Sequence, residues 1–432
     1  MKKVLSILLV LILCVGLFAC GNKTDSTGSS APPADSGSAA QPAGGGDTPA
    51  PQPAGGGDTP AAQPSGGGDA APAQPSGGGD TPAAHVPQGY LTDDVDHHAR
   101  RTYEIAFLPD DFQFLQQNWF AGLQAFEERL NVKMTVLSAD SSFEQMLANI
   151  EMLTTRGYDG AIITAQYEIQ ERVTELLNEA GIPWICFINM LTDADGHTVA
   201  PTVVLDQYTA GEATMRWLID NYKEYWGDID TSKIGCMGIT MSISLDIFSR
   251  TSGQRDLFEA TFPGNQFLIL DTVSLGASGT AFMSAESAYD LVTAAVAANP
   301  DVEYWFVVGG GEQFGPGAAR AMEAFGRTLS NTLICTVHSG ANITDWQSKP
   351  PDVECMNIAS VYISDMLYGA PALSGVIALI EGRETKDTLW IDETPKDYKY
   401  GNNFGVWLIE SRIVTRWDYQ EYIDEINDMI FG

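Results

Sequence analysis

The chain has 432 residues and carries 56 acidic against 23 basic side chains, so its formal net charge is −33. Nucleic acids and anionic lipid surfaces require a basic binding face, so no nucleic-acid partner is expected for so acidic a chain. The length allows two or three domains, although the first part of the chain lacks the apolar residues of a folded domain.

Residues 1–19 are predicted to be a secretory signal peptide. Two lysines precede the apolar run from Val4 to Phe18, which is shorter than the about 20 apolar residues of a membrane-spanning helix. The run ends in Ala19 and Cys20, and this ending resembles the bacterial lipobox, in which a cysteine becomes lipid-modified, with Phe18 as a departure from the usual pattern. We expect lipidated Cys20 to anchor the chain in the cell membrane. The alternative is an ordinary secretory signal.

Residues 20–100 are predicted to be a lipid-anchor cysteine followed by a disordered linker. An 11-residue unit of the form QP(A/S)GGGD with a Pro/Ala-rich tail recurs four times, beginning at Gln41, Gln52, Gln63 and Gln74. Apart from Ala and Pro, the repeat has almost nothing apolar to bury, so no core can offset the entropy of ordering it. Gly runs are flexible and Pro segments are extended, so this segment is expected to hold a folded domain away from the membrane.

Four further cysteines lie in apolar, strand-like segments: Cys186, Cys236, Cys335 and Cys355. The chain has no CxxC pair and no Cys/His cluster, so neither a metal site nor a cofactor is expected. Buried free thiols are the favoured interpretation, and a disulfide between Cys335 and Cys355 is the alternative.

From residue 101 onward short apolar runs alternate with helical patterns. The first predicted strands are residues 103–108, 132–137, 160–164 and 183–188. The predicted helices between and after them are residues 119–130, 143–156 and 169–180. Repeated βαβ units of this kind predict a parallel sheet with helices on both faces.

The pattern then begins again. The second set of predicted helices is residues 210–225, 250–261, 281–299 and 315–325. The second set of predicted strands is residues 233–239, 267–273, 304–308 and 333–337. Two successive doubly wound sheets predict an α/β protein of two lobes. Ligands of such sheets bind beyond the carboxyl ends of the strands, and two lobes can close on a ligand as a clamp.

Several short motifs follow one another in this region. They are Asn149-Ile150-Glu151, Arg156 to Gly160, Gly181-Ile182-Pro183, Asp206-Gln207 with Gly211, Arg250 to Gly253, Asn299 to Val302, and Ile413-Val414-Thr415. Their order and spacing resemble the type I periplasmic-binding protein family, in particular its ribose- and galactose-like branch of sugar ABC transporter substrate-binding lipoproteins. The resemblance covers the chain from about Tyr103 to the C-terminus.

This resemblance implies two doubly wound parallel-sheet lobes joined by a three-crossover hinge. The N-terminal lobe would comprise residues 101–206 plus about 361–390, and the C-terminal lobe residues 207–360 plus about 391–432. Asp206 would lie at the hinge, as a capping residue rather than a ligand contact.

The resemblance also implies a set of ligand-binding residues. Those of the first lobe are Phe112, Phe114, Leu115, Thr164 and Asn189, and those of the second are Arg250, Gly311, Glu312, Gln313, His338 and Ser360. Aromatic rings of the first loop would stack on a sugar ring, and the planar donors of Arg250 would bind adjacent hydroxyls. Gly311 and His338 stand where an amide and an acid are common in the family, so the resemblance does not determine which solute is bound. Trp119 is expected to be a core residue.

The family resemblance implies a binding protein and not an enzyme, and the sequence has no nucleophile elbow, metal cluster or paired acid–base motif. The expected ligand is a monosaccharide or related polyol. A monomer outside the cell membrane, held there by Cys20, would deliver this solute to a membrane ABC permease. The alternatives are a sensor that presents its closed form to a chemoreceptor or kinase, and a binder of a non-sugar solute.

Overall fold

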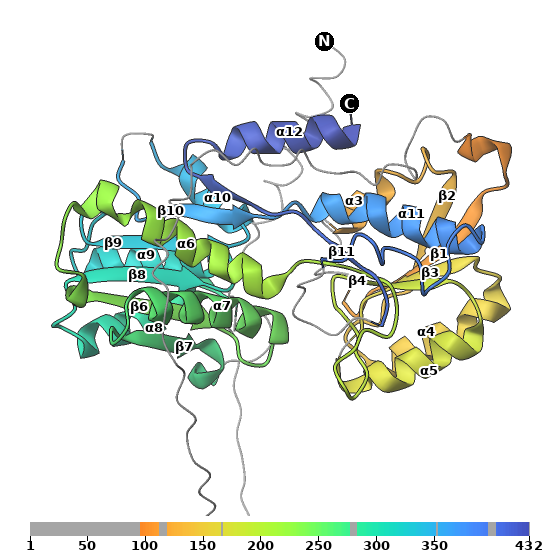
Figure 1. Ribbon diagram of the computed structural model, residues 1–432, viewed down its shortest axis with the longest axis horizontal. Helices are drawn as coiled ribbons and strands as arrows, with labels where there is room; N and C mark the ends of the chain where they lie inside the picture. Colours follow the sequence, from red (N-terminus) through yellow and green to blue (C-terminus); the bar gives the residue numbers. More distant parts are fainter. Residues whose placement is uncertain are drawn as a thin grey trace, which may run out of the picture. The chain divides into compact units, whose positions relative to one another are not determined.

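The computed structural model describes residues 96–111, 119–165, 167–276, 283–350, 353–395 and 403–431. The predicted signal peptide, Cys20 and the repeat linker lie outside these residues. Within them the chain forms two six-stranded sheets, each covered by helices (Figure 1). None of the described helices is both long and apolar enough to cross a membrane.

The first sheet has the strand order β11-β5-β4-β3-β1-β2, and all its strands run parallel. Its strands are β1 (Tyr103–Leu108), β2 (Val132–Val136), β3 (Gly160–Ile163), β4 (Trp184–Phe187), β5 (Thr202–Val204) and β11 (Val406–Leu408). Its helices are α3 (Trp119–Gln124), α4 (Phe143–Arg156), α5 (Gln170–Ala180) and α11 (Gly369–Ile380). The strands β3 and β4 are buried throughout, as expected for a parallel sheet with helices on both faces. We call this sheet and its helices the first lobe.

The second sheet has the order β12-β10-β9-β8-β6-β7, in which only β12 runs antiparallel to its neighbour. Its strands are β6 (Ile234–Thr240), β7 (Phe267–Asp271), β8 (Tyr304–Gly309), β9 (Thr332–Val337), β10 (Asn357–Tyr362) and β12 (Arg412–Thr415). One of its helices, α6 (Gln207–Trp226), follows β5 of the first sheet. The others follow strands of the second sheet and are α7 (Leu245–Thr261), α8 (Ala285–Ala298), α9 (Phe314–Ala324), α10 (Gly340–Ser348) and α12 (Tyr419–Phe431). We call this sheet and its helices the second lobe.

The chain passes between the two sheets three times, after β5, after β10 and after β11, which confirms the predicted fold class. One lobe boundary differs from the expectation. The strand β11 pairs with β5 in the first sheet, whereas the resemblance implies a second-lobe position for residues 391–432.

The predicted strands are all present, with ends that differ by at most two residues. Four predicted helices differ by three residues or more at one end. The helix α6 begins at Gln207 and not at residue 210, and α8 begins at Ala285 and not at residue 281. The helix α3 ends at Gln124, and residues 125–130 continue as turns. The helix α7 begins at Leu245 and not at Arg250, because the Ser244 side chain accepts a hydrogen bond from the N–H of Ile247 and caps the helix there.

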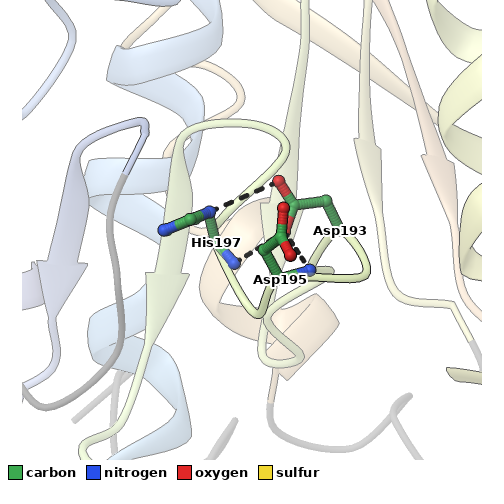
Figure 2. Close-up of side chains that lie close together, drawn as sticks. All are labelled: Asp193, Asp195 and His197. Carbon is green, nitrogen blue, oxygen red and sulfur yellow. Dashed lines mark hydrogen bonds and ion pairs between the residues drawn. The ribbon is translucent and has the colours of Figure 1, made fainter.

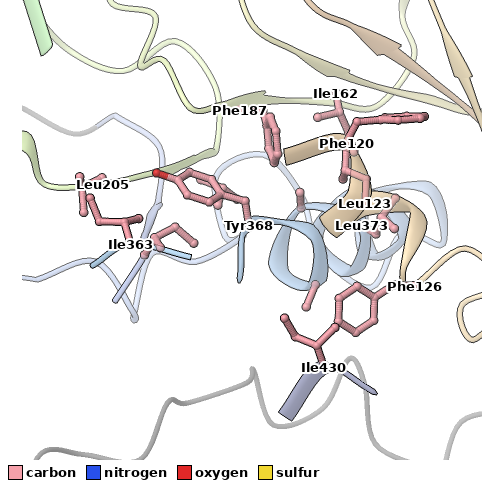
Figure 3. Packing of buried hydrophobic residues seen from close by; sticks show 14 of the residues in the cluster. Phe120, Leu123, Phe126, Ile162, Phe187, Leu205, Ile363, Tyr368, Leu373 and Ile430 are labelled. Atoms are coloured by element: carbon pink, nitrogen blue, oxygen red, sulfur yellow. The ribbon is translucent and has the colours of Figure 1, made fainter. Parts of the chain in front are cut away.

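The three crossings are packed into one apolar cluster (Figure 3). Leu205 follows β5, Ile363 follows β10 and Ile409 follows β11, and all three are buried in the cluster with first-lobe residues such as Phe187. Figure 3 shows Leu205 and Ile363 beside Phe187 and Tyr368, the residue just before α11. The rings of Phe187 and Tyr368 meet edge to face with centroids 5.6 Å apart. The segments that connect the lobes are therefore tied to the core of the first lobe.

Candidate functional site

Two polar residues of the first lobe meet where β1 and β3 end. The hydroxyl of Thr164 donates to Oδ1 of Asp110 over 3.0 Å and accepts the N–H of Asp110 over 3.1 Å. The N–H of Asp111 donates to the same Oδ1 over 2.9 Å. The other carboxylate oxygen, Oδ2, has no hydrogen-bond partner within the described residues. Thr164, an expected ligand residue, is therefore engaged in holding Asp110.

Burial raises the pKa of Asp110, and the hydrogen bonds from Thr164 and Asp111 only partly oppose this effect. Asn189, another expected ligand residue, lies two residues past the end of β4. Its Nδ2 donates to the carbonyl of Ala165 over 3.3 Å. The side chain of Asn189 is half-buried, and its amide oxygen is available as an acceptor. The expected contacts Phe112, Phe114 and Leu115 lie outside the described residues.

Arg250 is the centre of the second-lobe cluster and is buried on α7. Its Nε donates to Oε1 of Gln207 and its Nη1 to the carbonyl of Gly310, each over 2.7 Å. Its Nη2 lies 3.4 Å from Nε2 of His338. Arg250 thus joins α6, the end of β8 and the end of β9, and uses three of its five N–H groups. Burial lowers the pKa of Arg250, but a guanidinium stays charged at neutral pH.

His338 follows β9 in the left-handed backbone region, with φ of +66°. Burial and the charge of Arg250 lower its pKa well below the ordinary value of 6.5, so its ring is neutral at neutral pH. If Nε2 accepts from Arg250, the proton lies on Nδ1, which is 3.9 Å from Oδ1 of Asp365. This contact is therefore between a neutral ring and a carboxylate. The ring of Trp119, from the first lobe, meets that of His338 edge to face at 6.4 Å.

Glu312 and Gln313 follow β8, where the family resemblance places ligand contacts. The carboxylate of Glu312 accepts backbone N–H groups of Gly340 and Ala341, in the first turn of α10, and burial raises its pKa. Glu312 is thus a cap of α10. The side-chain oxygen of Gln313 is buried and has no hydrogen-bond partner among the residues that the structure describes, and Gly311 is buried beside it.

Ser360 lies within β10 and is fully buried. Its hydroxyl, which has a single proton to donate, lies within hydrogen-bond distance of the carbonyl oxygens of Thr336 and His338. It also accepts from Nδ2 of Asn342 over 3.0 Å. Ser360 therefore supports the turn that carries His338 and does not reach the surface where a ligand could bind.

Asp206, the expected hinge residue, lies in the first crossing and caps α6. Its carboxylate accepts from the N–H of Thr209 over 3.1 Å and from the Thr209 hydroxyl over 2.8 Å. The structure thus gives Asp206 the capping contacts that the sequence predicts.

Several site residues were missed by the sequence reasoning, and they share a signal: they are polar or aromatic and lie just past a strand end or in the first turn of a helix. They are Asp110, Trp119, Tyr167, Gln207, Asp246 and Asp365. The hydroxyl of Tyr167, which begins the 3-10 helix η2 (Tyr167–Ile169) after β3, lies 3.5 Å from Oδ1 of Asp246 on α7. Burial raises the pKa of Asp246, and the charge of Arg250 opposes this.

Three ligand-type side chains gather in the turn after β4 (Figure 2): Asp193, Asp195 and His197. Oδ1 of Asp193 accepts the N–H groups of Asp195 and His197, each over 2.9 Å. The two aspartates are exposed, and these bonds are those of an ordinary Asx turn. The cluster is explained as a turn.

The four described cysteines, Cys186, Cys236, Cys335 and Cys355, are free and buried. The alternative of a disulfide between Cys335 and Cys355 is therefore wrong. Burial raises the pKa of the Cys186 thiol to about 11, which leaves it unreactive at neutral pH.

Comparison with known proteins gives a consistent match in sequence and in structure. A family model described as a periplasmic binding protein domain matches residues 105–344. A search of curated proteins found no match.

Several solved structures share the fold. An ABC transporter solute-binding protein from Bacillus halodurans C-125 with bound myo-inositol is 15% identical, with a TM-score of 0.54 over 75% of this chain and 98% of that one. A 5-methylthioribose transporter solute-binding protein from Thermotoga lettingae TMO, in complex with 5-methylthioribose, is 18% identical, with a TM-score of 0.54 over 76% and 92%. An ABC transporter periplasmic solute-binding protein from Actinobacillus succinogenes 130z with bound D-allose is 16% identical, with a TM-score of 0.54 over 74% of this chain and 100% of that one.

Proposed function

The chain belongs to the periplasmic binding protein family, and from this premise we propose that it binds a small polyhydroxylated solute, a monosaccharide or related polyol, between its two lobes. The bound solute would pass to an ABC importer without chemical change. In this proposal the ligand closes the lobes, and the closed form docks on the permease.

The observation that carries this proposal is the meeting of side chains from both lobes. Tyr167, after β3 of the first lobe, lies 3.5 Å from Asp246 on α7 of the second. Trp119 of the first lobe and His338 of the second are in ring contact. All four lie at strand ends or helix starts, where ligands of doubly wound sheets bind. A solute at this point would touch both lobes at once.

The chemistry of the site suits hydroxyl groups, each of which both donates and accepts a hydrogen bond. Asp110 and Asn189 offer acceptor oxygens, and Arg250 retains N–H groups that its protein partners do not use. The indole of Trp119 offers an aromatic surface for the C–H groups of a sugar ring. The structural neighbours that hold myo-inositol, D-allose and 5-methylthioribose support a ligand of this class.

A thermal-shift screen of the full chain in detergent over pentoses, hexoses, inositols and nucleosides tests the proposal. A ligand at a hundredfold excess over its dissociation constant stabilises the protein by about 2.7 kcal/mol. For a domain of 150–250 residues this corresponds to a rise in melting temperature of about 5–10 °C. The proposal fails if no polyol shifts the melting temperature while an amino acid or peptide does.

The role of Arg250 is tested by a charge-preserving variant. Arg250→Lys keeps the cation but loses the planar donors, so affinity for the solute found in the screen should fall at least tenfold. Arg255→Lys, at a partly exposed position on the same helix, is the matched control and should bind as the parent does. Equal affinity of both variants would remove Arg250 from the site.

We also propose that the protein is an extracytoplasmic lipoprotein held by Cys20, because an apolar leader precedes this cysteine and a long Gly/Pro-rich linker follows it. Cells that express Cys20→Ser should incorporate no labelled fatty acid into the protein and should release it from the membrane. Deletion of the gene should abolish uptake of the solute; unchanged uptake with loss of a cellular response to the solute would indicate a sensor instead.

A further inference from the structure

The first lobe contains a pocket that lies apart from the proposed solute site. It has a volume of about 280 Å³ and lies where the helices α5 and α11 end and the strand β4 begins. The solute site lies beyond the carboxyl ends of the strands, so the two sites are at opposite edges of the sheet. The pocket is lined by apolar and polar side chains, among them Leu177, Ile182, Leu379, Asn178, Thr385 and Lys386. We call it the Lys386 pocket.

Lys386 forms no ion pair with a carboxylate among the described residues. Its Nζ donates to Oδ1 of Asn178 over 2.9 Å and lies 4.2 Å from the centroid of the Trp184 ring. The same Oδ1 accepts the indole N–H of Trp184 over 3.3 Å. Other lysines of this acidic chain pair with carboxylates: Lys133 with Glu104, Lys233 with Glu303 and Lys349 with Asp345. The ammonium of Lys386 therefore contacts neutral groups alone.

This environment makes the amine of Lys386 easier to deprotonate. Burial lowers the pKa of Lys386 to about 8, and the nearby Cys186 and Asp387 only partly oppose this effect. At pH 7.5 about a quarter of the molecules then carry a free amine at this position, against about one in a thousand for a lysine of ordinary pKa. Only the free amine is a nucleophile, and the side chain is half-buried, so a small molecule can reach it from the pocket.

We propose that Lys386 is a covalent modification site for small aldehydes, including the open-chain forms of reducing sugars. The free amine adds to the aldehyde carbon, and the adduct loses one water to give an imine, in which a C=N bond replaces the C=O bond. No oxidant or reductant is needed for this step. The imine nitrogen then takes up a proton and becomes a cation with one N–H group. The inference concerns a second site and does not depend on the proposed function.

The pocket favours an aldehyde because the product keeps the contacts that the ammonium makes. A protonated imine retains a positive charge for the face of Trp184 and an N–H group for Oδ1 of Asn178. Acylation would remove the charge. Addition of carbon dioxide would replace it with a negative charge in a pocket that Glu384 also lines. Among these electrophiles, only the aldehyde gives a product that suits the surroundings of Lys386.

Reductive trapping on the full chain in detergent tests this inference. The protein is incubated at pH 7.5 with D-glyceraldehyde and sodium cyanoborohydride, which delivers hydride to the imine carbon and makes the adduct permanent. Peptide mapping by mass spectrometry gives the initial rate of labelling at each lysine. Lys386 should be labelled about tenfold faster than Lys223, an exposed lysine on α6, because its larger share of free amine outweighs the weaker nucleophilicity that accompanies a lower pKa. D-ribose should show the same preference, and methyl β-D-riboside, which cannot open to an aldehyde, should give no adduct.

Asn178→Asp tests whether the neutral surroundings of the amine cause its reactivity. The variant places a carboxylate of the same shape 2.9 Å from Nζ, and an opposite charge so close stabilises the ammonium. Labelling of Lys386 at pH 7.5 should therefore fall about tenfold. Asn427→Asp, at an exposed position on α12, is the matched control and should be labelled as the parent is. Lys386→Arg keeps the cation but should lose the fast adduct altogether.

Three results would overturn the inference. Lys386 labelled no faster than Lys223 would show that the pocket gives no special reactivity, and fast labelling of Lys386 in folded Asn178→Asp protein would remove the cause assigned to it. Labelling by D-glyceraldehyde but not by D-ribose would exclude reducing sugars. If the melting temperature shows that Asn178→Asp is unfolded, the pH dependence of the parent decides. The preference for Lys386 should decrease from pH 7 to pH 9, because amines of ordinary pKa gain free base over this range in greater proportion; a constant preference would refute the inference.

Discussion

Helices α6 and α7 pack so closely that a single methyl group should force them apart. The Cβ of an alanine at position 211 would lie 1.9 Å from the carbonyl oxygen of Arg250. At Gly253, on the other side of the same crossing, a Cβ would lie 2.2 Å from the carbonyl oxygen of Tyr208. The blocking atoms belong to helix backbones, so they cannot turn away as a flexible side chain would.

The size of the effect in Gly211→Ala follows from this geometry. A carbon and an oxygen without a bond between them need more than 3 Å, so the helices must separate locally by more than 1 Å. Overpacking of a close-packed interior costs about 1–3 kcal/mol, and an obstruction by backbone atoms places this change near the upper end. A loss of about 3 kcal/mol lowers the melting temperature by about 6–12 °C in a domain of 150–250 residues. The separation also stretches the bond of Arg250 to Gln207, so ligand affinity should fall with stability.

Differential scanning calorimetry of Gly211→Ala without ligand measures this effect. Gly157→Ala is the control, because Gly157 has a φ of +75° and open space around its Cβ position. The Gly157→Ala variant should therefore lose only the stability that a non-glycine residue costs in the left-handed region, about 1–2 kcal/mol. A Gly211→Ala protein that melts within about 1 °C of the parent, or no lower than Gly157→Ala, would show that the helices do not meet as described.

Two further predictions concern buried ionisable groups. Burial raises the pKa of Glu312, so its contribution to stability is present at low pH and is lost as the pH rises from 4.5 through the folded-state pKa. Glu312→Gln should therefore stabilise the protein at pH 7 by about 1 kcal/mol, which raises the melting temperature by a few degrees, and should give no gain at pH 4. The control, Glu323→Gln at an exposed position, should leave the melting temperature unchanged at both pH values. A gain for Glu312→Gln that persists at pH 4 would contradict the reasoning. Burial and Arg250 lower the pKa of His338, so its contribution is lost as the pH falls below 6.5, and His338→Gln should lose less stability than the parent between pH 7 and pH 5. Thermal denaturation against pH checks this, with partly exposed His197→Gln as the control; parallel curves for parent and His338→Gln would refute it.

The sequence predicts an element correctly where the apolar pattern of a segment and its length both indicate the same kind of element. Strands such as β4 and β9 are buried on both faces, so their sequences are continuous apolar runs bounded by turn residues. The helix α11 was missed for the opposite reason. All but its last two residues are buried, so it has no polar face to give a helical period, and Gly369 and Pro371 lie in its first turn. The strands β5 and β11 have three residues each, too few for any period.

The candidate site was predictable in position but not in its contacts. The family resemblance implied that Arg250 and His338 lie in one site, and the structure brings Nη2 of Arg250 within 3.4 Å of Nε2 of His338. The sequence could not show that Glu312 serves the first turn of α10, since that helix was not predicted. It also could not show that Asp110 is supported by Thr164, because the two are 54 positions apart and meet only through the pairing of β1 with β3.

The two most informative motifs of the sequence prove to be the two sides of one helix crossing. Asp206 caps α6, and Gly211 on that helix leaves room for the backbone of Arg250. Gly253 on α7 in turn leaves room for the backbone of Tyr208. This close approach allows Arg250 to reach Gln207 across the crossing.

With its backbone held there, Arg250 also reaches the carbonyl of Gly310 and the ring of His338 at the ends of β8 and β9. The motifs therefore specify the helix packing that positions the guanidinium of Arg250 in the site. They do not encode the solute, because Gln207 and Arg250 bind each other and other groups of the protein. Asp110 lies past the end of β1 and Asn189 past the end of β4, outside both motifs, and a change at either position would leave the helix crossing intact. In our proposal the motifs therefore specify the packing of the second lobe, while the choice of ligand depends on first-lobe side chains that the motifs do not include.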